Sequence, residues 1–263
     1  MRRAPCIAIA TLLAVSLVDE ARAWGPVGHR VVGQIASRQL SDEVRGEVLA
    51  ILGGASLAEA SVWMDDVRSE PRYDWLEPLH YVNLDPRRGR FQSCPPRGCI
   101  VDALRDARTK VGDHALPRAE RREALRILIH LVGDLHQPLH VSHRADRGGN
   151  DVGVDWFGQR SNLHWVWDTG LLRDRGRWQQ LADRLEGSLR DARLAREAAS
   201  WRSGDVVDWT HESYRLTVEA VYPSAAAGSK LGRSYVERYA PVAERQLLLA
   251  GVRLAAVLEA ALR

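Results

Sequence analysis

Apolar residues recur along most of the chain at the spacing of an α-helix, and one segment is apolar on nearly every side. Between Leu125 and Leu135, side chains placed about 100° apart around a helix axis point apolar groups in almost all directions. The pattern predicts a central, buried helix that carries His130 and Asp134 one turn apart on a shared face. A buried carboxylate without a partner is strongly destabilising. The pair therefore needs a neutralising contact, either with each other or with a metal ion, because imidazole nitrogen and carboxylate oxygen are both zinc ligands.

Amphipathic helices are predicted for most of the remaining chain. Ser41 is expected to cap one of them, Gly53-Gly54 to end it, and Pro117 to start the central helix. The predicted helical ranges are 26–40, 41–52, 57–68, 100–114, 117–137, 205–222 and 241–262, with further helices from 178 onward. The last range is apolar enough to suggest a membrane anchor, but charged residues interrupt it, which favours an amphipathic core helix.

Two stretches depart from the helical pattern. Residues 71–97 are rich in proline, arginine and aromatic residues, which predicts a long and mostly irregular loop. After Gly148-Gly149, alternating Val152, Val154 and Trp156 predict one strand of a small hairpin that turns near Gly158-Gln159. The sequence contains no internal repeat, low-complexity tract or linker. We therefore expect a mainly α fold, a single domain of packed helices with one short β-hairpin.

The first residues have the features of a secretory signal peptide. Arg2 and Arg3 form a basic start, the apolar run 7–18 follows, and Ala21-Arg22-Ala23 matches a cleavage site. The run is too short to span a bilayer comfortably. We expect residues 1–23 to be removed, leaving a mature domain of residues 24–263 that is secreted or periplasmic and has no membrane anchor after removal of the signal.

The cysteines are consistent with an exported protein, and the net charge adds little to these predictions. With Cys6 in the predicted leader, Cys94 and Cys99 remain, separated by Pro95-Pro96-Arg97-Gly98. In an exported protein this spacing favours a small disulfide loop, with two free thiols as the alternative. The formal net charge of +3 is too small to indicate a polyanionic partner. The 9 tryptophans belong mostly to the core, although such rings also suit a site that stacks planar ligands.

The segments around the central pair resemble a known family. They resemble the zinc-dependent single-strand nucleases of the S1/P1 type, which share their fold with bacterial zinc phospholipase C. The matching segments, in order, are Trp24-Gly25-Pro26-Val27-Gly28-His29, Trp63-Met64-Asp65-Asp66-Val67-Arg68, Leu79-His80-Tyr81-Val82, His130-Leu131-Val132-Gly133-Asp134, Gln137-Pro138-Leu139-His140, Gly148-Gly149-Asn150, Asn162-Leu163-His164 and Trp167-Asp168-Thr169. Beyond about residue 170 only the helical character agrees.

The resemblance implies a cofactor of three Zn²⁺ ions. The implied ligand sets are Asp65, His80, His130 and Asp134 for one ion; Trp24, His29 and Asp134 for another; and His140, His164 and Asp168 for the third. Trp24 would bind through its free α-amine and its carbonyl, so removal of the leader after Ala23 would also complete the site. Of two adjacent carboxylates, the family register favours Asp65 over Asp66.

Family members of this kind hydrolyse phosphodiester bonds in single-stranded DNA and RNA to 5′-mononucleotides, and many also remove 3′-phosphates from nucleotides. The resemblance therefore implies single-stranded DNA, RNA and 3′-nucleotides as partners and Asp65, Arg68 and Asp134 as catalytic residues. Arg68 would stabilise charge on the phosphate; its alternative role is a surface salt bridge. Three Zn²⁺ ions against three aspartates leave a net positive site that would attract phosphate.

Further substrate contacts and rival functions stay open at this stage. Tyr81 is the candidate for stacking a nucleobase, or else a core tyrosine. Asn150 and Asn162 could hydrogen-bond phosphate or base, or serve as turn residues. His114, His136, His143 and His211 are expected to be structural or surface groups. The rival functions are a zinc phospholipase C acting on lipid phosphodiesters and an exported zinc-binding protein without catalysis; we expect a monomer.

Overall fold

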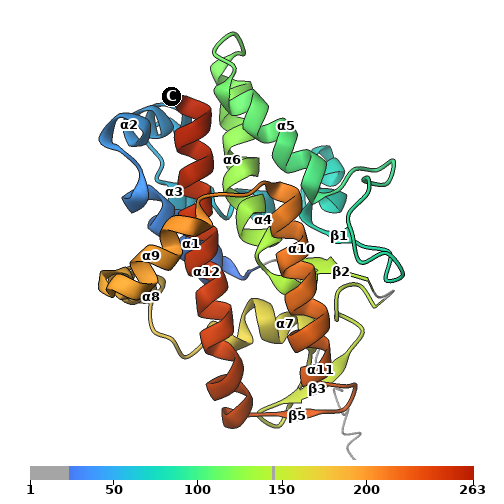
Figure 1. Cartoon of the computed structure of the whole chain (residues 1–263). Coiled ribbons are helices and arrows are strands. Elements are labelled where there is room, and N and C mark those ends of the chain that lie inside the picture. The colour runs from blue at the N-terminus through green and yellow to red at the C-terminus, as the bar shows by residue number, and fades with distance from the viewer. Residues whose placement is uncertain (1–23, 144–145) are drawn as a thin grey trace, which may run out of the picture.

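Helix α6 (Arg118–Leu135) lies in the middle of the molecule, flanked by α5 (Ile100–Gly112) and α12 (Arg233–Leu262) (Figure 1). The computed structural model describes residues 24–143 and 146–263, so the predicted signal peptide lies outside the described residues. Every residue of α6 from Ile127 to Leu135 is buried. The prediction of a central, buried helix is therefore confirmed, because an all-round apolar surface can only be covered by neighbours on all sides.

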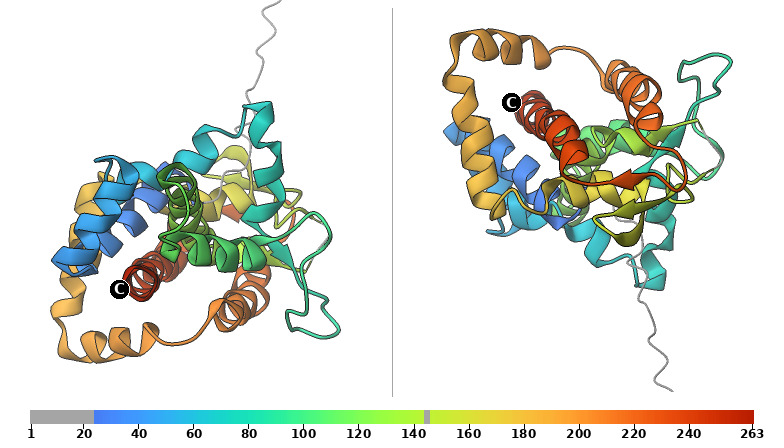
Figure 2. Two further views of the ribbon diagram at one scale, coloured as in Figure 1. Left: turned by 90° about the horizontal axis from the view of Figure 1, so that it is seen from above. Right: turned by 90° about the horizontal axis from the view of Figure 1, so that it is seen from below.

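The other helices surround this core. In both views of Figure 2, the chain from α9 to α10 passes around one side of α12. The remaining α-helices are α1 (Pro26–Gln39), α2 (Asp42–Leu52), α3 (Leu57–Ala60), α4 (Trp63–Asp66), α7 (Leu163–Asp168), α8 (Trp178–Gly187), α9 (Ala192–Trp201), α10 (Val206–Leu216) and α11 (Tyr222–Ser224). Short 3₁₀ turns occupy Pro138–His140, Gly170–Leu172 and Ser188–Arg190, and a π-helical turn spans Thr217–Val221.

The predicted ends of α2 are confirmed. The Ser41 hydroxyl oxygen accepts a hydrogen bond from the Val44 amide at 3.4 Å, and Gly53 ends the helix with φ +72°. Helix α12 begins eight residues before the predicted start at 241, so Pro241 lies inside it. Its first turns are held by tertiary contacts: Tyr235 is buried, and its hydroxyl accepts a hydrogen bond from Trp167 Nε1 at 3.0 Å. Such packing outweighs the intrinsic cost of an internal proline.

The structure corrects two of the sequence-based element predictions. The expected helix over 57–68 is interrupted between α3 and α4, at Ser61 and Val62. The interruption leaves the Ser61 carbonyl oxygen as the acceptor for His130 Nδ1, at 2.7 Å. The expected loop at 71–97 begins with a 3₁₀-helix over Pro71–His80. This helix buries Leu76 and His80, a long-range effect that local composition does not show.

The predicted hairpin is confirmed, with strands β3 (Gly153–Trp156) and β4 (Gln159–Asn162). Its turn residues, Phe157 and Gly158, have φ of +52° and +82°, the left-handed values that a two-residue hairpin turn requires. Two further pairings were not predicted: β5 (Lys230–Leu231) adds parallel to β3, and β1 (Val82–Asn83) pairs parallel with β2 (Val141–Ser142). The second pairing joins the chain just after His80 to the chain just after His140.

The expected disulfide forms between Cys94 and Cys99, with Cα atoms 5.3 Å apart, and closes the loop that leads into α5. In the described part of the chain, no single helix is long and apolar enough to cross a membrane; one bent pair, α2 with α3 and α4, meets the criterion by length and composition only. Helix α12 does not meet it and buries most of its apolar face.

Candidate metal centre

The Asp134 carboxylate lies at the centre of a cluster of imidazoles. Oδ1 is 3.2 Å from His29 Nε2, and Oδ2 is 2.9 Å from His80 Nδ1 and 3.3 Å from His130 Nε2. The same oxygen is 3.8 Å from His140 Nδ1. Asp134, His29 and His130 are fully buried. Side chains that are far apart in the sequence thus converge on one carboxylate.

The members of the cluster come from several parts of the fold. Helix α1 supplies His29, α4 supplies Asp65, and the 3₁₀-helix supplies His80 at its last position. His140 ends the Pro138–His140 turn. Helix α7 supplies His164 and Asp168 one turn apart, with Nε2 and Oδ2 separated by 3.1 Å. The structure therefore brings together all the side chains that the sequence singled out as metal ligands.

Trp24 also lies beside the cluster. It is fully buried, and a Cβ atom added at Gly133 would lie 3.9 Å from Trp24 Cδ1 and 2.9 Å from His29 Nδ1. The next amide, that of Gly25, donates a hydrogen bond to the Asp168 carbonyl at 3.0 Å. The first residue after the predicted cleavage site is therefore held against the same helices as the ligands. Gly133 matters here because a larger residue would push His29 away.

Three of the imidazoles are oriented by backbone carbonyl groups. The Nδ1 atoms of His130, His140 and His164 each lie 2.7 Å from a carbonyl oxygen, those of Ser61, His80 and Gly148 respectively. A carbonyl oxygen only accepts, so each Nδ1 carries a proton, and Nε2 offers its lone pair whenever the ring is neutral. Metal-binding histidines are commonly fixed in this way by the ring nitrogen that does not bind the metal.

Several buried atoms of the cluster have no hydrogen-bond partner. Among the described residues, neither ring nitrogen of His29 and neither oxygen of Asp65 has a hydrogen-bond partner of suitable geometry, although all four atoms are buried. Buried polar atoms are normally paired. A cation among these atoms would satisfy them, so the residues present fit metal ions.

Donor spacing divides the cluster into three groups, two of which share His130, and within each group the ligand atoms lie within 4.8 Å of one another. The groups are His29, Asp65 and His130; His80, His130 and Asp134; and His140, His164 and Asp168. The third group is the set that the sequence predicted for one ion. The first two overlap with the remaining predicted sets but pair Asp65 with His29. Histidine and carboxylate are typical zinc ligands, and none of the groups is closed by four side chains.

Burial and mutual charge shift the pKa values of the cluster in opposite directions. Burial raises the pKa of Asp134, but His130 and His140 more than offset it and hold that pKa well below its usual range. Burial lowers the pKa of His130, yet Asp134 and Asp65 raise it to about 9. Burial lowers the pKa of His140 to about 3 and raises that of Asp168 to about 6. Such opposed shifts in one pocket are typical of functional sites.

The structure also places the expected substrate residues. Arg68 is exposed just after α4, and Tyr81, 39 % exposed, follows His80, so Tyr81 is not a core residue. Burial and Glu77 raise the pKa of Tyr81 while Arg97 and Arg68 lower it, which places Arg68 within electrostatic range of its hydroxyl. Of the adjacent carboxylates, Asp65 is buried and Asp66 is exposed.

Both asparagines have local hydrogen bonds. The Asn162 side-chain oxygen accepts from the Trp165 amide at 2.7 Å and caps α7, the helix that carries His164 and Asp168. The Asn150 side-chain amide donates to the Arg147 carbonyl at 2.8 Å. Their turn and capping roles are therefore occupied in this structure, and a substrate contact stays a prediction.

Sequence reasoning missed Gln137. Its side-chain amide donates to Asp168 Oδ1, and its own Oε1 accepts from the Leu139 amide at 2.6 Å. It therefore positions the Asp168 carboxylate. The only sequence signal was its place in Gln137-Pro138-Leu139-His140, where it was treated as part of the motif. His136, expected to be structural, lies outside the cluster: its Nδ1 is 2.7 Å from the Val132 carbonyl and its Nε2 is 3.0 Å from Arg253 Nη1.

A buried cluster of histidines and aspartates inside a mainly helical fold is typical of metal-binding α-helical proteins. The family model described as S1/P1 Nuclease matches residues 24–263, and the chain belongs to this family. The match begins at Trp24, the residue after the predicted cleavage site.

Curated relatives agree along nearly the whole chain. Endonuclease 3 of Arabidopsis thaliana is 28 % identical over 273 residues, covering 95 % of this chain and 92 % of the relative. Nuclease P1 of Penicillium citrinum is 30 % identical over 265 residues, covering 88 % of this chain and 95 % of the relative. Nuclease S1 of Aspergillus oryzae is 27 % identical over 262 residues, covering 90 % of this chain and 91 % of the relative. The similarity thus spans the metal-ligand cluster and the helices after it.

Proposed function

We propose that the protein is a zinc-dependent nuclease that hydrolyses single-stranded DNA and RNA to 5′-mononucleotides and also acts as a 3′-nucleotidase. Family membership and the names of its relatives support hydrolysis of nucleic acids. The observation that carries the proposal is the convergence of unpaired histidine and aspartate donors around Asp134. We further propose that residues 1–23 are a cleaved signal peptide and that the mature monomer is secreted or periplasmic.

The proposed cofactor is three zinc ions. Their ligands are those that the family resemblance implies, with Asp134 shared by two ions and Trp24 contributing its α-amine. When bound, zinc lowers the pKa of its water to about 7 and polarises phosphoryl oxygen, so no side-chain general base is needed. The three aspartates only partly offset the charge of three divalent ions, which leaves a site that attracts phosphate.

The protein side chains position these groups and the substrate. Asp134 holds two ligand sets in register, and the backbone carbonyls fix the imidazoles before substrate arrives. Arg68 is assigned to the negative charge that increases on the phosphate in the transition state. Tyr81 is assigned to stacking of a base, a contact worth about 1–3 kcal/mol that does not depend on base identity. Asn150 and Asn162 are assigned to the border of the substrate site.

Metal content measured together with nuclease activity tests the proposal. We expect wild-type protein to bind three zinc ions and to cleave single-stranded DNA. Asp134→Asn should lose two of the ions and nearly all activity, because it removes a shared carboxylate charge from both sets. Circular dichroism controls for folding. Unchanged turnover in Asp134→Asn would remove this residue from the mechanism.

A second variant and a second substrate keep the test independent of folding. Arg68 is exposed, so Arg68→Ala should retain all metal while kcat falls by about 100–1,000-fold, in the range of lost charge stabilisation. Phosphatidylcholine tests the rival lipid activity on the same preparation. Cleavage of the lipid without cleavage of single-stranded DNA contradicts the proposed function, as does bound zinc without hydrolysis of either substrate.

A further inference from the structure

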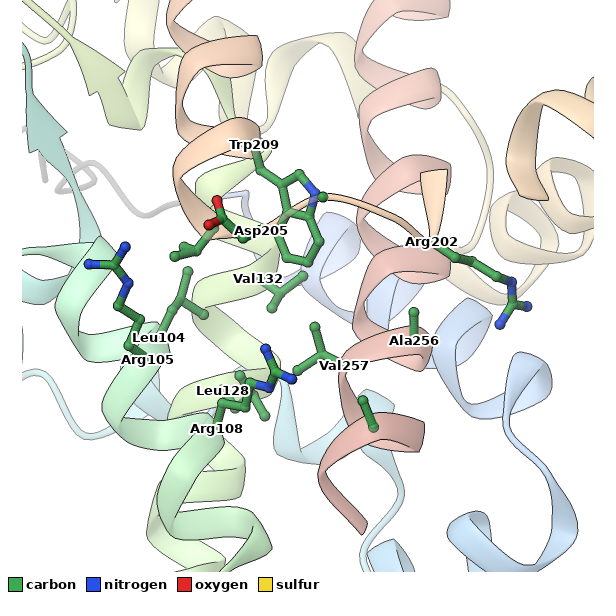
Figure 3. A pocket seen from close by; sticks show the side chains of 13 residues that line it. Leu104, Arg105, Arg108, Leu128, Val132, Arg202, Asp205, Trp209, Ala256 and Val257 are labelled. Atoms are coloured by element: carbon green, nitrogen blue, oxygen red, sulfur yellow. The ribbon is translucent and has the colours of Figure 1, made fainter. Parts of the chain in front are cut away.

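A cavity of about 290 Å³ lies on the side of α6 that faces away from the metal-ligand cluster (Figure 3). Leu128 and Val132, one turn apart on α6, line it, whereas His130 and Asp134 project from the opposite side of the same helix. The other walls come from α5, from α12 and from the segment between α9 and α10. The cavity is therefore separate from the proposed active site.

The floor of the cavity is aliphatic. Leu104, Leu128 and Val132 are at most 4 % exposed, and the wall from α12 consists of the short side chains of Ala256 and Val257. Trp209 closes one end. Its ring is only 5 % exposed and is contacted by Arg253 at 5.0 Å, so it offers an apolar edge and no free face for stacking a planar base.

The mouth of the cavity is positively charged. Arg105, Arg108 and Arg202 line it, together with a single carboxylate, that of Asp205. The Asp205 carboxylate is already engaged, because its Oδ1 accepts the Val207 and Asp208 amides at 2.8 and 3.0 Å and caps α10.

Arg108 is the arginine best placed to receive an anion. Figure 3 shows its side chain extending from α5 towards α12, across the cavity. Within residues 24–143 and 146–263 it has no ion-pair or hydrogen-bond partner, whereas Arg105 lies 3.6 Å from Asp102 and Arg202 donates to Gln39 at 3.0 Å. A guanidinium group binds a carboxylate through two parallel hydrogen bonds.

We propose that this cavity binds a medium-chain aliphatic carboxylate, with the chain among Leu104, Leu128 and Val257 and the head group on Arg108. The volume of the cavity limits the length of the ligand. One water molecule occupies about 30 Å³ in the liquid, and at that volume per non-hydrogen atom the cavity holds about ten atoms. Ten atoms correspond to a carboxylate with a chain of about eight carbons. Such a ligand removes apolar surface from water and neutralises Arg108, whereas a nucleobase finds neither a stacking face nor a set of polar partners.

Isothermal titration calorimetry of the zinc-loaded protein with sodium octanoate tests this site. We expect one octanoate per chain and an affinity at least tenfold higher than that of octylamine, which has the same chain and the opposite charge. Octanoate should also raise the melting temperature, because a ligand that binds only the folded state stabilises it.

Three variants locate the site. Arg108→Glu, at an exposed position, should weaken octanoate binding at least tenfold, whereas Arg190→Glu, an exposed arginine outside the cavity, should bind like wild type. Ala256→Trp should fill the cavity and abolish binding while retaining the circular dichroism spectrum and nuclease activity of the parent.

Equal affinity for octylamine and octanoate, or unchanged binding by Arg108→Glu, overturns the proposal. Binding of 5′-AMP in place of octanoate, abolished by the same variants, also overturns it, because the occupant would then be a nucleotide.

Discussion

At the Asp168 carboxylate, a proton would compete with zinc for the same oxygen atoms. Burial raises the pKa of its carboxyl to about 6, and Asp168 also raises the pKa of His164. His140, in the same group, has a pKa lowered by burial to about 3 and stays neutral above that pH. Both Asp168 and His164 must be deprotonated to bind a metal ion.

We therefore expect the zinc affinity of the His140, His164 and Asp168 group to decrease as pH falls through 6. The sign follows from both groups: above the raised pKa of His164 both are free to bind, and below pH 6, where Asp168 and His164 both take up a proton, each pH unit costs more than tenfold in affinity. Zinc retention at pH 7 and at pH 5, measured against a chelator, checks this. An affinity that is flat across this interval contradicts the assignment of Asp168 as a ligand.

Gln137 is a positioning residue for the Asp168 carboxylate. Gln137→Ala removes the hydrogen bond to Asp168 Oδ1 and leaves the Leu139 amide without its acceptor. We expect about a 10–100-fold loss in affinity for one of three zinc ions, the range seen when a group that orients a ligand is removed. Chelator competition followed by metal analysis measures it. Retention of all three ions at wild-type affinity would show that Asp168 is positioned without Gln137.

At the scale of elements, the packing of α1 on α6 depends on Gly133. A Cβ atom at this position would lie 2.9 Å from His29 Nδ1, closer than packed atoms tolerate. Gly133→Ala should therefore displace His29, weaken zinc binding and lower activity, although alanine favours helix formation by about 1 kcal/mol over glycine.

Gly46→Ala provides the matched control. Gly46 lies inside α2, and a Cβ atom there has no neighbour within 4 Å. This variant should gain up to about 1 kcal/mol in stability with no change in metal content. Chemical denaturation and zinc analysis of both variants separate the two effects. A Gly133→Ala protein with full metal content and activity would show that α1 can shift without losing the site.

At the scale of the whole molecule, the chain brings Trp24, the first residue after the proposed cleavage site, and residues more than a hundred positions away into one site. Trp24 is buried, and the adjacent Gly25 amide is bonded to Asp168. An α-amine binds zinc only when it is free. Protein that begins at Trp24 should therefore bind one more zinc ion, and be far more active, than protein carrying one extra alanine before Trp24.

Mass spectrometry of the intact chains verifies the two amino ends, and metal analysis with a single-stranded DNA assay compares them. Equal zinc content and activity in both proteins would exclude the Trp24 amine as a ligand. Because Trp24 itself is kept in both, the comparison does not alter the packing of its side chain.

The sequence by itself determined the helical elements and the identities of the cluster residues. Apolar periodicity is a local property, so α1, α2, α5 and α6 could be predicted close to their observed ends, and the spacing of His130 and Asp134 placed both on one buried face. Only the tertiary structure decided the interruption at Ser61, the 3₁₀-helix that ends at His80, the β1–β2 pairing and the position of Gln137 beside Asp168. These features depend on backbone carbonyls and on contacts between distant segments, and neither produces a periodic pattern of apolar and polar residues in the sequence.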